Sequence, residues 1–270
     1  MAIVLCIAVS CKKDKPAKTT DQVTPTLIPP VTDPGKGIYA DSVFYVQDGN
    51  YRVSPLSSAS GNYSCIPEGL KIEETTGVID VNKSETGLKY QVTFTDNATG
   101  QTKTSFIIIS GINYQDKIYN LANGDSIAAP IYNANAKLAL PDANKNSIFD
   151  TDGGCKHAGI VVNGGDAKIN LALSVRNQGI DTGSTEEVKL AYRINDNSNK
   201  ALNGLDVKIY FYRTSSEIPQ YLTDLLNERK TTIFDANPFS PTQQNNRLIM
   251  NKAAKKASRP RPPCIIVVSR

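Results

Sequence analysis

Short segments of alternating apolar and polar residues constrain the fold of this chain more than any other feature of its sequence. From Gly37 onward such segments recur, and residues 102–110 are β-branched and apolar on both faces. Alternation with a period of two puts every second side chain on one buried face of a strand. Polar turn residues such as Thr76–Gly77 and Thr99–Gly100 separate the segments. The pattern predicts strands at 42–47, 90–95, 102–110, 159–162, 167–175, 187–194, 205–212 and 264–268.

One helix is well signalled near 217–229. Ser216 can cap it, Pro219 falls in its first turn, and the apolar residues that follow are spaced to form one helical face. These apolar residues are Ile218, Leu222, Leu225 and Leu226. We expect this helix to pack on a sheet. A second helix is expected over 243–257, before Pro260, Pro262 and Pro263 end it.

The length of the chain predicts more than one core. At about 100 to 200 residues per domain, 270 residues fit a tail and two domains. The fold class that we predict is mainly β, with two β-sandwich-type domains and one or two helices added to the second. The expected divisions are 1–11, 12–37, 38–111 and 112–270.

The N-terminal segment carries the pattern of an export signal. Residues 1–11 form an uncharged apolar run that is too short to cross a bilayer, which needs about 20 residues. Residues 12–37 contain five prolines with Lys, Thr and Asp, and such a segment favours an extended tether over a packed core. The run ends at Ser10–Cys11, followed by Lys12–Lys13. The alternative interpretation is a frayed apolar terminus with a chance cysteine.

Ser10–Cys11 and the residues after it resemble the lipoprotein export signals of Bacteroidetes. The resemblance implies cleavage before Cys11, lipid modification of Cys11, and anchoring in the cell envelope at the outer membrane or cell surface. Ala8 departs from this pattern, which usually has Leu or Val there, and no basic segment precedes the apolar run.

A second resemblance covers residues 38 to 111. The segments Pro67-Glu68-Gly69-Leu70, Thr76-Gly77-Val78-Ile79 and Gly87-Leu88-Lys89-Tyr90-Gln91-Val92 resemble the immunoglobulin-like and cadherin-like repeats of bacterial surface proteins. The resemblance implies a β-sandwich for this part of the chain. It does not imply calcium, because the acidic ligand motifs of true cadherins are missing. Residues 112–270 resemble no family that we can name.

One loop has the oxygen spacing of a calcium site. Side-chain oxygens fall at positions one, three, five, nine and eleven of the stretch 142–152, as hard cations require. The loop lacks the Gly at position six and the Glu at position twelve of a helix-flanked calcium loop. The alternative is a surface loop rich in Asx turns. The candidate ligands are Asp142, Asn144, Asn146, Asp150 and Asp152.

Other reactive residues have simple structural interpretations. His157 is the one histidine and lacks the partners of a catalytic triad, so a structural or exposed role is expected. Cys65, Cys155 and Cys264 show no metal spacing; a bridge between the last two and buried free thiols both remain open. The basic residues Arg247, Lys252, Lys255, Lys256, Arg259 and Arg261 indicate either a solvated helix face or a contact with anionic glycan or lipid.

The functional hypothesis follows from these elements together. We expect a lipid-anchored envelope module that binds or supports other components, without catalytic activity, without a cofactor beyond the candidate calcium ion, and without nucleic acid as a partner, since the net charge is only +4. The alternative is a glycan-binding component of a polysaccharide-uptake system, for which exposed Tyr210, Tyr212 or Tyr221 would serve as a platform. A glycan-acting enzyme is the third hypothesis.

Overall fold

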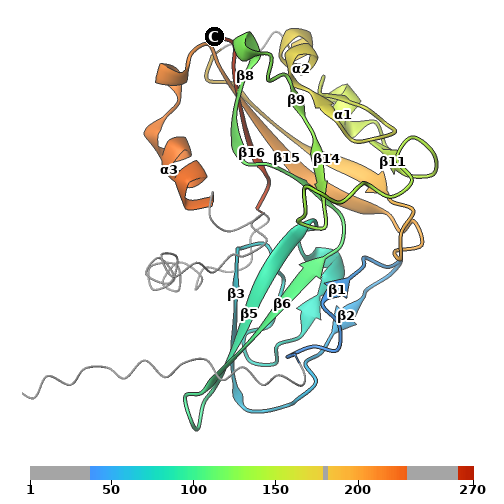
Figure 1. The fold of residues 1–270 in the computed structure, drawn as a ribbon, viewed down its shortest axis with the longest axis vertical. Helices are drawn as coiled ribbons and strands as arrows, with labels where there is room; N and C mark the ends of the chain where they lie inside the picture. Colours follow the sequence, from blue (N-terminus) through green and yellow to red (C-terminus); the bar gives the residue numbers. More distant parts are fainter. Residues whose placement is uncertain (1–36, 179–181, 230–260) are drawn as a thin grey trace, which may run out of the picture.

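The computed structural model describes residues 37–178, 182–229 and 261–270, which form two β-rich units (Figure 1). The predicted fold class is confirmed, because the described chain is mainly β with few helices. The predicted tail 1–36 and the predicted helix at 243–257 lie outside the described residues. None of the described helices is long and apolar enough to span a membrane.

The first unit contains a four-stranded sheet of order β1-β6-β5-β3 and a two-stranded sheet formed by β2 and β4. Tyr90 and Val92 of β5 are fully buried, as their alternation predicts. Gly77 adopts a left-handed φ of 69°, and a Cβ there would lie 2.6 Å from the ring of Tyr63, so the expected turn needs a glycine. The strands are β1 (Val43–Phe44), β2 (Arg52–Val53), β3 (Gly61–Ile66), β4 (Ile79–Asp80), β5 (Leu88–Asp96) and β6 (Thr102–Ile109), with the 3-10 helix η1 (Val81–Lys83).

The second unit is built on a five-stranded mixed sheet of order β11-β14-β15-β16-β8. The last strand of the chain, β16, pairs in parallel with both β15 and β8. The strands of the unit are β7 (Ile112–Tyr114), β8 (Lys117–Asn120), β9 (Ile127–Ala128), β10 (Pro130–Tyr132), β11 (Ile148–Phe149), β12 (Val161–Val162), β13 (Ile169–Asn170), β14 (Thr185–Arg193), β15 (Asn203–Tyr212) and β16 (Cys264–Val268).

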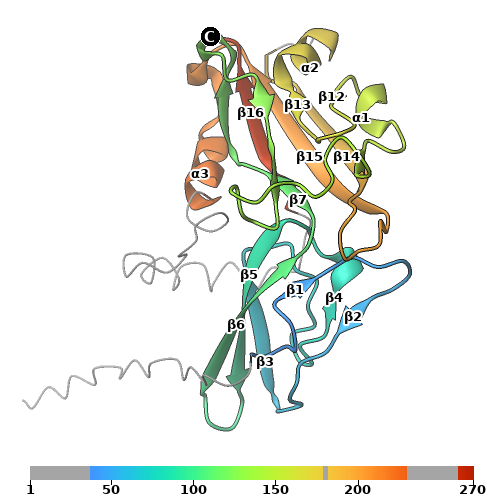
Figure 2. The same cartoon turned by 45° about the vertical axis from the view of Figure 1, so that its right-hand side comes forward.

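Helices cover both faces of the five-stranded sheet. On one side lie α1 (Gly154–His157) and α2 (Leu171–Gln178), together with the sheet β12-β13-β9; on the other lies α3 (Gln220–Arg229), as Figures 1 and 2 show. The short 3-10 helices are η2 (Leu121–Asn123) and η3 (Ser215–Glu217). The predicted packing of α3 is confirmed, since Leu222 and Leu226 are buried against the sheet.

Alternation along β15 divides its side chains between two hydrophobic clusters. Leu205, Val207 and Ile209 enter the main core of the second unit, whereas Tyr210 and Tyr212 face α3. The core of the first unit ends at Ile109 and takes one residue from the second, Ala201, in the loop between β14 and β15. The two units therefore share packing at this loop.

Several predicted strands differ from those observed, and the strand expected at 159–162 is only Val161–Val162. The strand expected at 167–175 ends at Asn170, where α2 begins, because the Asn170 side chain accepts from the Leu173 N–H at 2.9 Å and caps the helix. The strand expected at 42–47 is a strand only over Val43–Phe44, where it pairs with β6. The strand expected at 102–110 is not buried on both faces, because Phe106 is 38% exposed and only Ile107 and Ile109 of β6 are fully buried.

Candidate functional site

A buried charged cluster joins the two units and the last strand of the chain. Asp116 follows β7 and is 9% exposed. Its Oδ2 accepts from Nη2 of Arg261 at 2.9 Å, and its Oδ1 accepts from Nη1 of Arg229 at 3.1 Å and from the backbone N–H of Cys264. Asp116 thus holds the end of α3 and the start of β16 beside β7.

Glu85 extends this cluster into the first unit. It lies in the segment before β5, and its carboxylate accepts from Asn113 Nδ2 at 2.9 Å and from the backbone N–H of Arg261. The Asn113 amide also donates to the Thr86 carbonyl at 3.0 Å. Arg229 donates to the Pro262 carbonyl at 3.0 Å. Four segments that are distant in the sequence therefore meet at the two carboxylates.

Burial sets the electrostatics of the cluster. Burial raises the pKa of Glu85 to about 7, against the opposing effects of Arg261 and the Asn113 hydrogen bond. Burial likewise lowers the pKa of Arg261, which is 4% exposed, while the charge of Asp116 opposes that shift. Nη1 of Arg261 has no hydrogen-bond partner among the described residues. The cluster is held by charge pairing in a region from which water is largely excluded.

The hydrogen bonds of Asp116 and Glu85 are suited to holding distant segments of the chain together. Every carboxylate oxygen of Asp116 and Glu85 accepts a hydrogen bond from an arginine, an amide or a backbone N–H. A carboxylate with a pKa near neutrality is also typical of a catalytic site, although structural ion pairs shift pKa values in the same way. Because both carboxylates already have protein donors, the geometry favours a structural role at the junction.

Two hydroxyl contacts add to the junction between the units. The Tyr192 hydroxyl on β14 lies 2.7 Å from Thr86 Oγ1 and accepts from the Ile112 N–H at 3.3 Å. Asp196, in the loop between β14 and β15, accepts from Tyr132 at 2.7 Å and from Ser110 at 3.2 Å. Buried polar groups need such partners to offset their loss of water. These bonds fix the β14–β15 hairpin against the first unit.

The five candidate calcium ligands lie in consecutive turns. Asp142, Asn144 and Asp150 have positive φ angles of 46°, 59° and 54°, which Asp and Asn tolerate better than most residues. Asp150 accepts from the backbone N–H groups of Cys155 at 2.8 Å and Lys156 at 3.0 Å, so it caps α1. This turn chemistry explains why the stretch is rich in Asp and Asn.

The remaining candidates are also engaged within the protein. Asp142 accepts from the side-chain amides of Asn146 and Asn195, and Asp152 accepts from the Gly154 N–H at 3.1 Å. Asn144 packs against Gly165. Within the described ranges, no three His, Cys, Asp or Glu residues form a group that could hold a metal ion. Calcium binding through a set that includes Asn144 and Asn146 stays a prediction.

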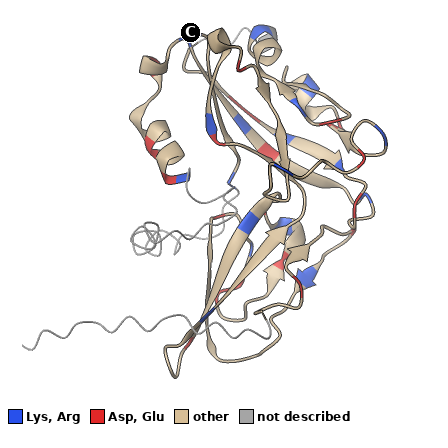
Figure 3. Ribbon diagram, viewed as in Figure 1, with Lys and Arg blue, Asp and Glu red and all other residues tan. Residues whose placement is uncertain are grey.

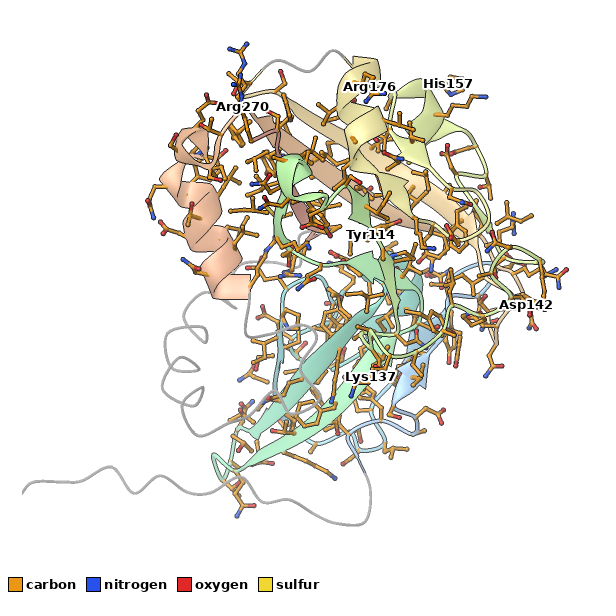
Figure 4. All side chains as sticks on the ribbon, turned by 45° about the horizontal axis from the view of Figure 1, so that its top comes forward. Tyr114, Lys137, Asp142, His157, Arg176 and Arg270 are labelled. Atoms are coloured by element: carbon orange, nitrogen blue, oxygen red, sulfur yellow. The ribbon has the colours of Figure 1, made fainter. Side chains whose placement is uncertain are left out.

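The other residues of interest take structural positions. His157 is exposed at the end of α1, well apart from Asp142 (Figure 4). Cys65, Cys155 and Cys264 are free thiols, so no bridge joins the last two. Burial raises the pKa of each thiol, to about 12 for Cys65 and Cys155 and to about 11 for Cys264. Thiols with such pKa values are poor nucleophiles near neutral pH.

Two expectations about surface residues are wrong. Arg261 is no part of a solvated basic face: it is buried and paired with Asp116, because the last strand carries it into the junction. Tyr210 and Tyr212 form no exposed platform, since α3 covers them; Tyr221 on α3 is 62% exposed. Elsewhere, acidic and basic residues are interspersed along the described ribbon (Figure 3). Cys11 and the basic residues from Arg247 to Arg259 lie outside the described residues.

Sequence reasoning missed the charged cluster. Glu85, Asp116 and Arg261 belong to no spacing motif, and 176 residues separate Glu85 from Arg261. The position of Arg261 directly before an apolar strand could have indicated the cluster. A charged residue beside a buried strand is rarely buried unless it is paired with an opposite charge.

Comparison with known proteins assigns no family. No protein-family model matches the chain, and no curated protein matches it. Among solved structures, the crystal structure of Drosophila N-cadherin EC1-4 shows weak similarity, with 9% sequence identity and a TM-score of 0.19. The match covers 63% of this chain and 46% of that one, so the chain spans about half the length of the cadherin structure. This is a weak similarity to cadherin extracellular domains.

Proposed function

We propose that this chain is a lipid-anchored module of a bacterial cell envelope that binds or supports other components and does not catalyse a reaction. The observation that carries the proposal is the apolar run ending at Ser10–Cys11, followed by a proline-rich hydrophilic spacer before the first β-rich unit. Lipidation of Cys11 would supply the membrane contact, and the spacer would hold the folded units away from the bilayer.

The junction between the units supports a mechanical or binding role. Its carboxylates, Glu85 and Asp116, accept hydrogen bonds from donors in three chain segments, which favours a fixed arrangement of the two units. A rigid pair of β-rich units is suited to presenting a surface at a set distance from a membrane. Catalysis would instead need a titrating group within about 3 Å of a substrate atom.

The anchoring test compares two cysteines of the same apolar run. Cys11→Ala should abolish incorporation of labelled palmitate and release the protein from the membrane fraction. Cys6→Ala is the matched control and should keep both properties, because Cys6 precedes the cleavage site. Mass spectrometry of the wild-type N-terminus should find a lipid-modified Cys11. An unprocessed N-terminus, or a Cys11→Ala protein that still fractionates with the membrane, would contradict the proposal.

Glycan binding is the second candidate function, and the exposure of Tyr221 favours it. An exposed aromatic ring can stack on a sugar face, as aromatic residues do at many binding surfaces. On a glycan array, retention that Tyr221→Ala removes and Tyr45→Ala preserves would support it. Turnover of plant or host polysaccharides by the purified protein would support the enzyme hypothesis instead.

A further inference from the structure

The last strand of the chain fills a slot in the middle of the five-stranded sheet. Strand β16 lies between β15 and β8, and its five residues are at most 2% exposed. Its register is continuous on both sides: Ile265 pairs with Ile209 of β15 and with Lys117 of β8. The five residues of β16 run parallel to Lys208–Tyr212 of β15 without a break in register.

Both faces of the slot are apolar. Ile265 and Val267 enter the main core of the second unit, whereas Cys264, Ile266 and Val268 enter the cluster beneath α3. A copy whose slot is open would expose both cores to water and leave the facing edges of β15 and β8 without hydrogen-bond partners. Such an edge is a template for an incoming strand.

The entry to the slot is selective. An incoming strand must place an arginine against Asp116, a backbone N–H against Glu85, and a second backbone N–H against Asp116 three residues later. Five consecutive apolar residues must follow. Residues 261–268 of this chain meet these requirements, so a second copy of the chain carries a strand that fits.

We propose that the slot between β15 and β8 is a strand-binding site whose partner is the C-terminal strand of a second copy of this chain. Exchange between copies re-forms every contact that β16 makes within one copy, as in domain swapping. Residues 230–260 connect α3 to Arg261, and 31 residues have a maximum reach of about 100 Å, enough to enter a neighbouring molecule.

The order of folding supplies the open state that exchange requires. Ile265 pairs with Lys117 across 148 residues, and β16 is the last element of the chain. Pairings at such separation form late because loop closure must come first. The hairpin of β14 and β15 can therefore form before β16 docks, and at that stage the slot of one copy is available to another. This inference goes beyond the proposed function and does not depend on membrane anchoring.

A cross-chain disulfide tests the proposal directly. Lys208 and Cys264 are register partners on neighbouring strands, which lie about 4.8 Å apart, within the range that a disulfide spans. A full-length chain with Lys208→Cys and Cys264→Ser is co-expressed with a differently tagged chain that keeps Cys264. After mild oxidation, a non-reducing gel should show a product of twice the mass that carries both tags and disappears on reduction.

Two further variants make the result decisive. With Lys189→Cys in place of Lys208→Cys, the mixed product should be absent, because Lys189 lies on β14, one strand further from β16. A single chain with Lys208→Cys and intact Cys264 should form an internal disulfide, which shows that the variant folds and that the pair can oxidise. If this internal bond forms and the mixed product does not exceed the Lys189→Cys background, the strand stays within its own chain and the proposal is wrong.

Discussion

Replacing Asp116 by alanine tests whether the buried cluster holds the molecule together. Asp116 is the common acceptor for Arg261, Arg229 and the Cys264 N–H. The substitution leaves the Arg261 guanidinium buried with its charge partner removed, and its Nη1 already has no hydrogen-bond partner among the described residues. Breaking a buried ion pair from one side typically costs about 3 to 5 kcal/mol, because the remaining charge is desolvated and uncompensated. We expect Asp116→Ala to lower the free energy of unfolding by that amount.

An exposed ion pair of similar geometry provides the control. Lys189 and Asp206 lie 3.0 Å apart on β14 and β15, but their side chains are 64% and 30% exposed. Exposed pairs contribute less than about 1 kcal/mol, because water and salt screen them. Asp206→Ala should therefore change the stability much less than Asp116→Ala. Urea unfolding of the full chain, followed by circular dichroism and tyrosine fluorescence, measures both losses.

A double variant separates the effect of charge from the effect of packing. Asp116→Ala combined with Arg261→Met removes both charges and keeps much of the apolar volume of the arginine side chain. Its loss should be smaller than that of Asp116→Ala alone, since the Arg261 charge is gone and Arg229 still donates to the Pro262 carbonyl. The reasoning fails if Asp116→Ala costs no more than Asp206→Ala, or if the double variant is less stable than either single variant.

Three further predictions concern titration, packing and calcium. Burial raises the pKa of Glu85 to about 7 from an ordinary 4.5. Between these two pH values the folded state retains a proton that the unfolded chain releases. The stability that this proton contributes is complete below about pH 4.5 and is lost as the pH rises through 7. The free energy of unfolding of the wild type should therefore fall by about 3 kcal/mol more than that of Glu85→Gln between pH 4.5 and 7.5. Urea unfolding at several pH values measures this, and an equal dependence on pH in the two proteins would contradict it. Ile265→Ala should cost about 2 to 5 kcal/mol by leaving a cavity in the core, whereas Ile148→Ala, at a site 52% exposed, should cost well under 1 kcal/mol in the same assay. If the 142–152 loop binds calcium, millimolar calcium should raise the thermal transition, and Asp142→Asn should reduce that rise; an unchanged transition in the wild type would remove the hypothesis.

Local pattern was sufficient to predict the longest strands, but it did not predict β3 or β8. Alternation of side chains is a property of the strand backbone itself, so β5, β14 and β15 could be found without knowledge of their partners. Leu222 and Leu226 likewise predicted α3 and its packing on a sheet, although the helix begins at Gln220 and is not capped by Ser216. The prediction failed at Asn170, where a side-chain cap turned an apolar run into a helix. A cap depends on one hydrogen bond, which alternation does not reveal.

The sequence by itself therefore determined the fold class, the longest strands and the apolar residues of α3, because each depends on neighbours a few positions apart. Only the tertiary structure decided where β16 inserts and which charges meet at the junction. The pairing of β16 with β8 and the contact of Arg261 with Glu85 join residues separated by 148 and 176 positions. Such contacts depend on how whole sheets and their cores pack together. Burial of an unpaired charge is unfavourable, so charges that are buried at the junction are paired with opposite charges. The sequence shows which residues are charged, whereas the packing of the two units determines which charged residues are buried next to one another.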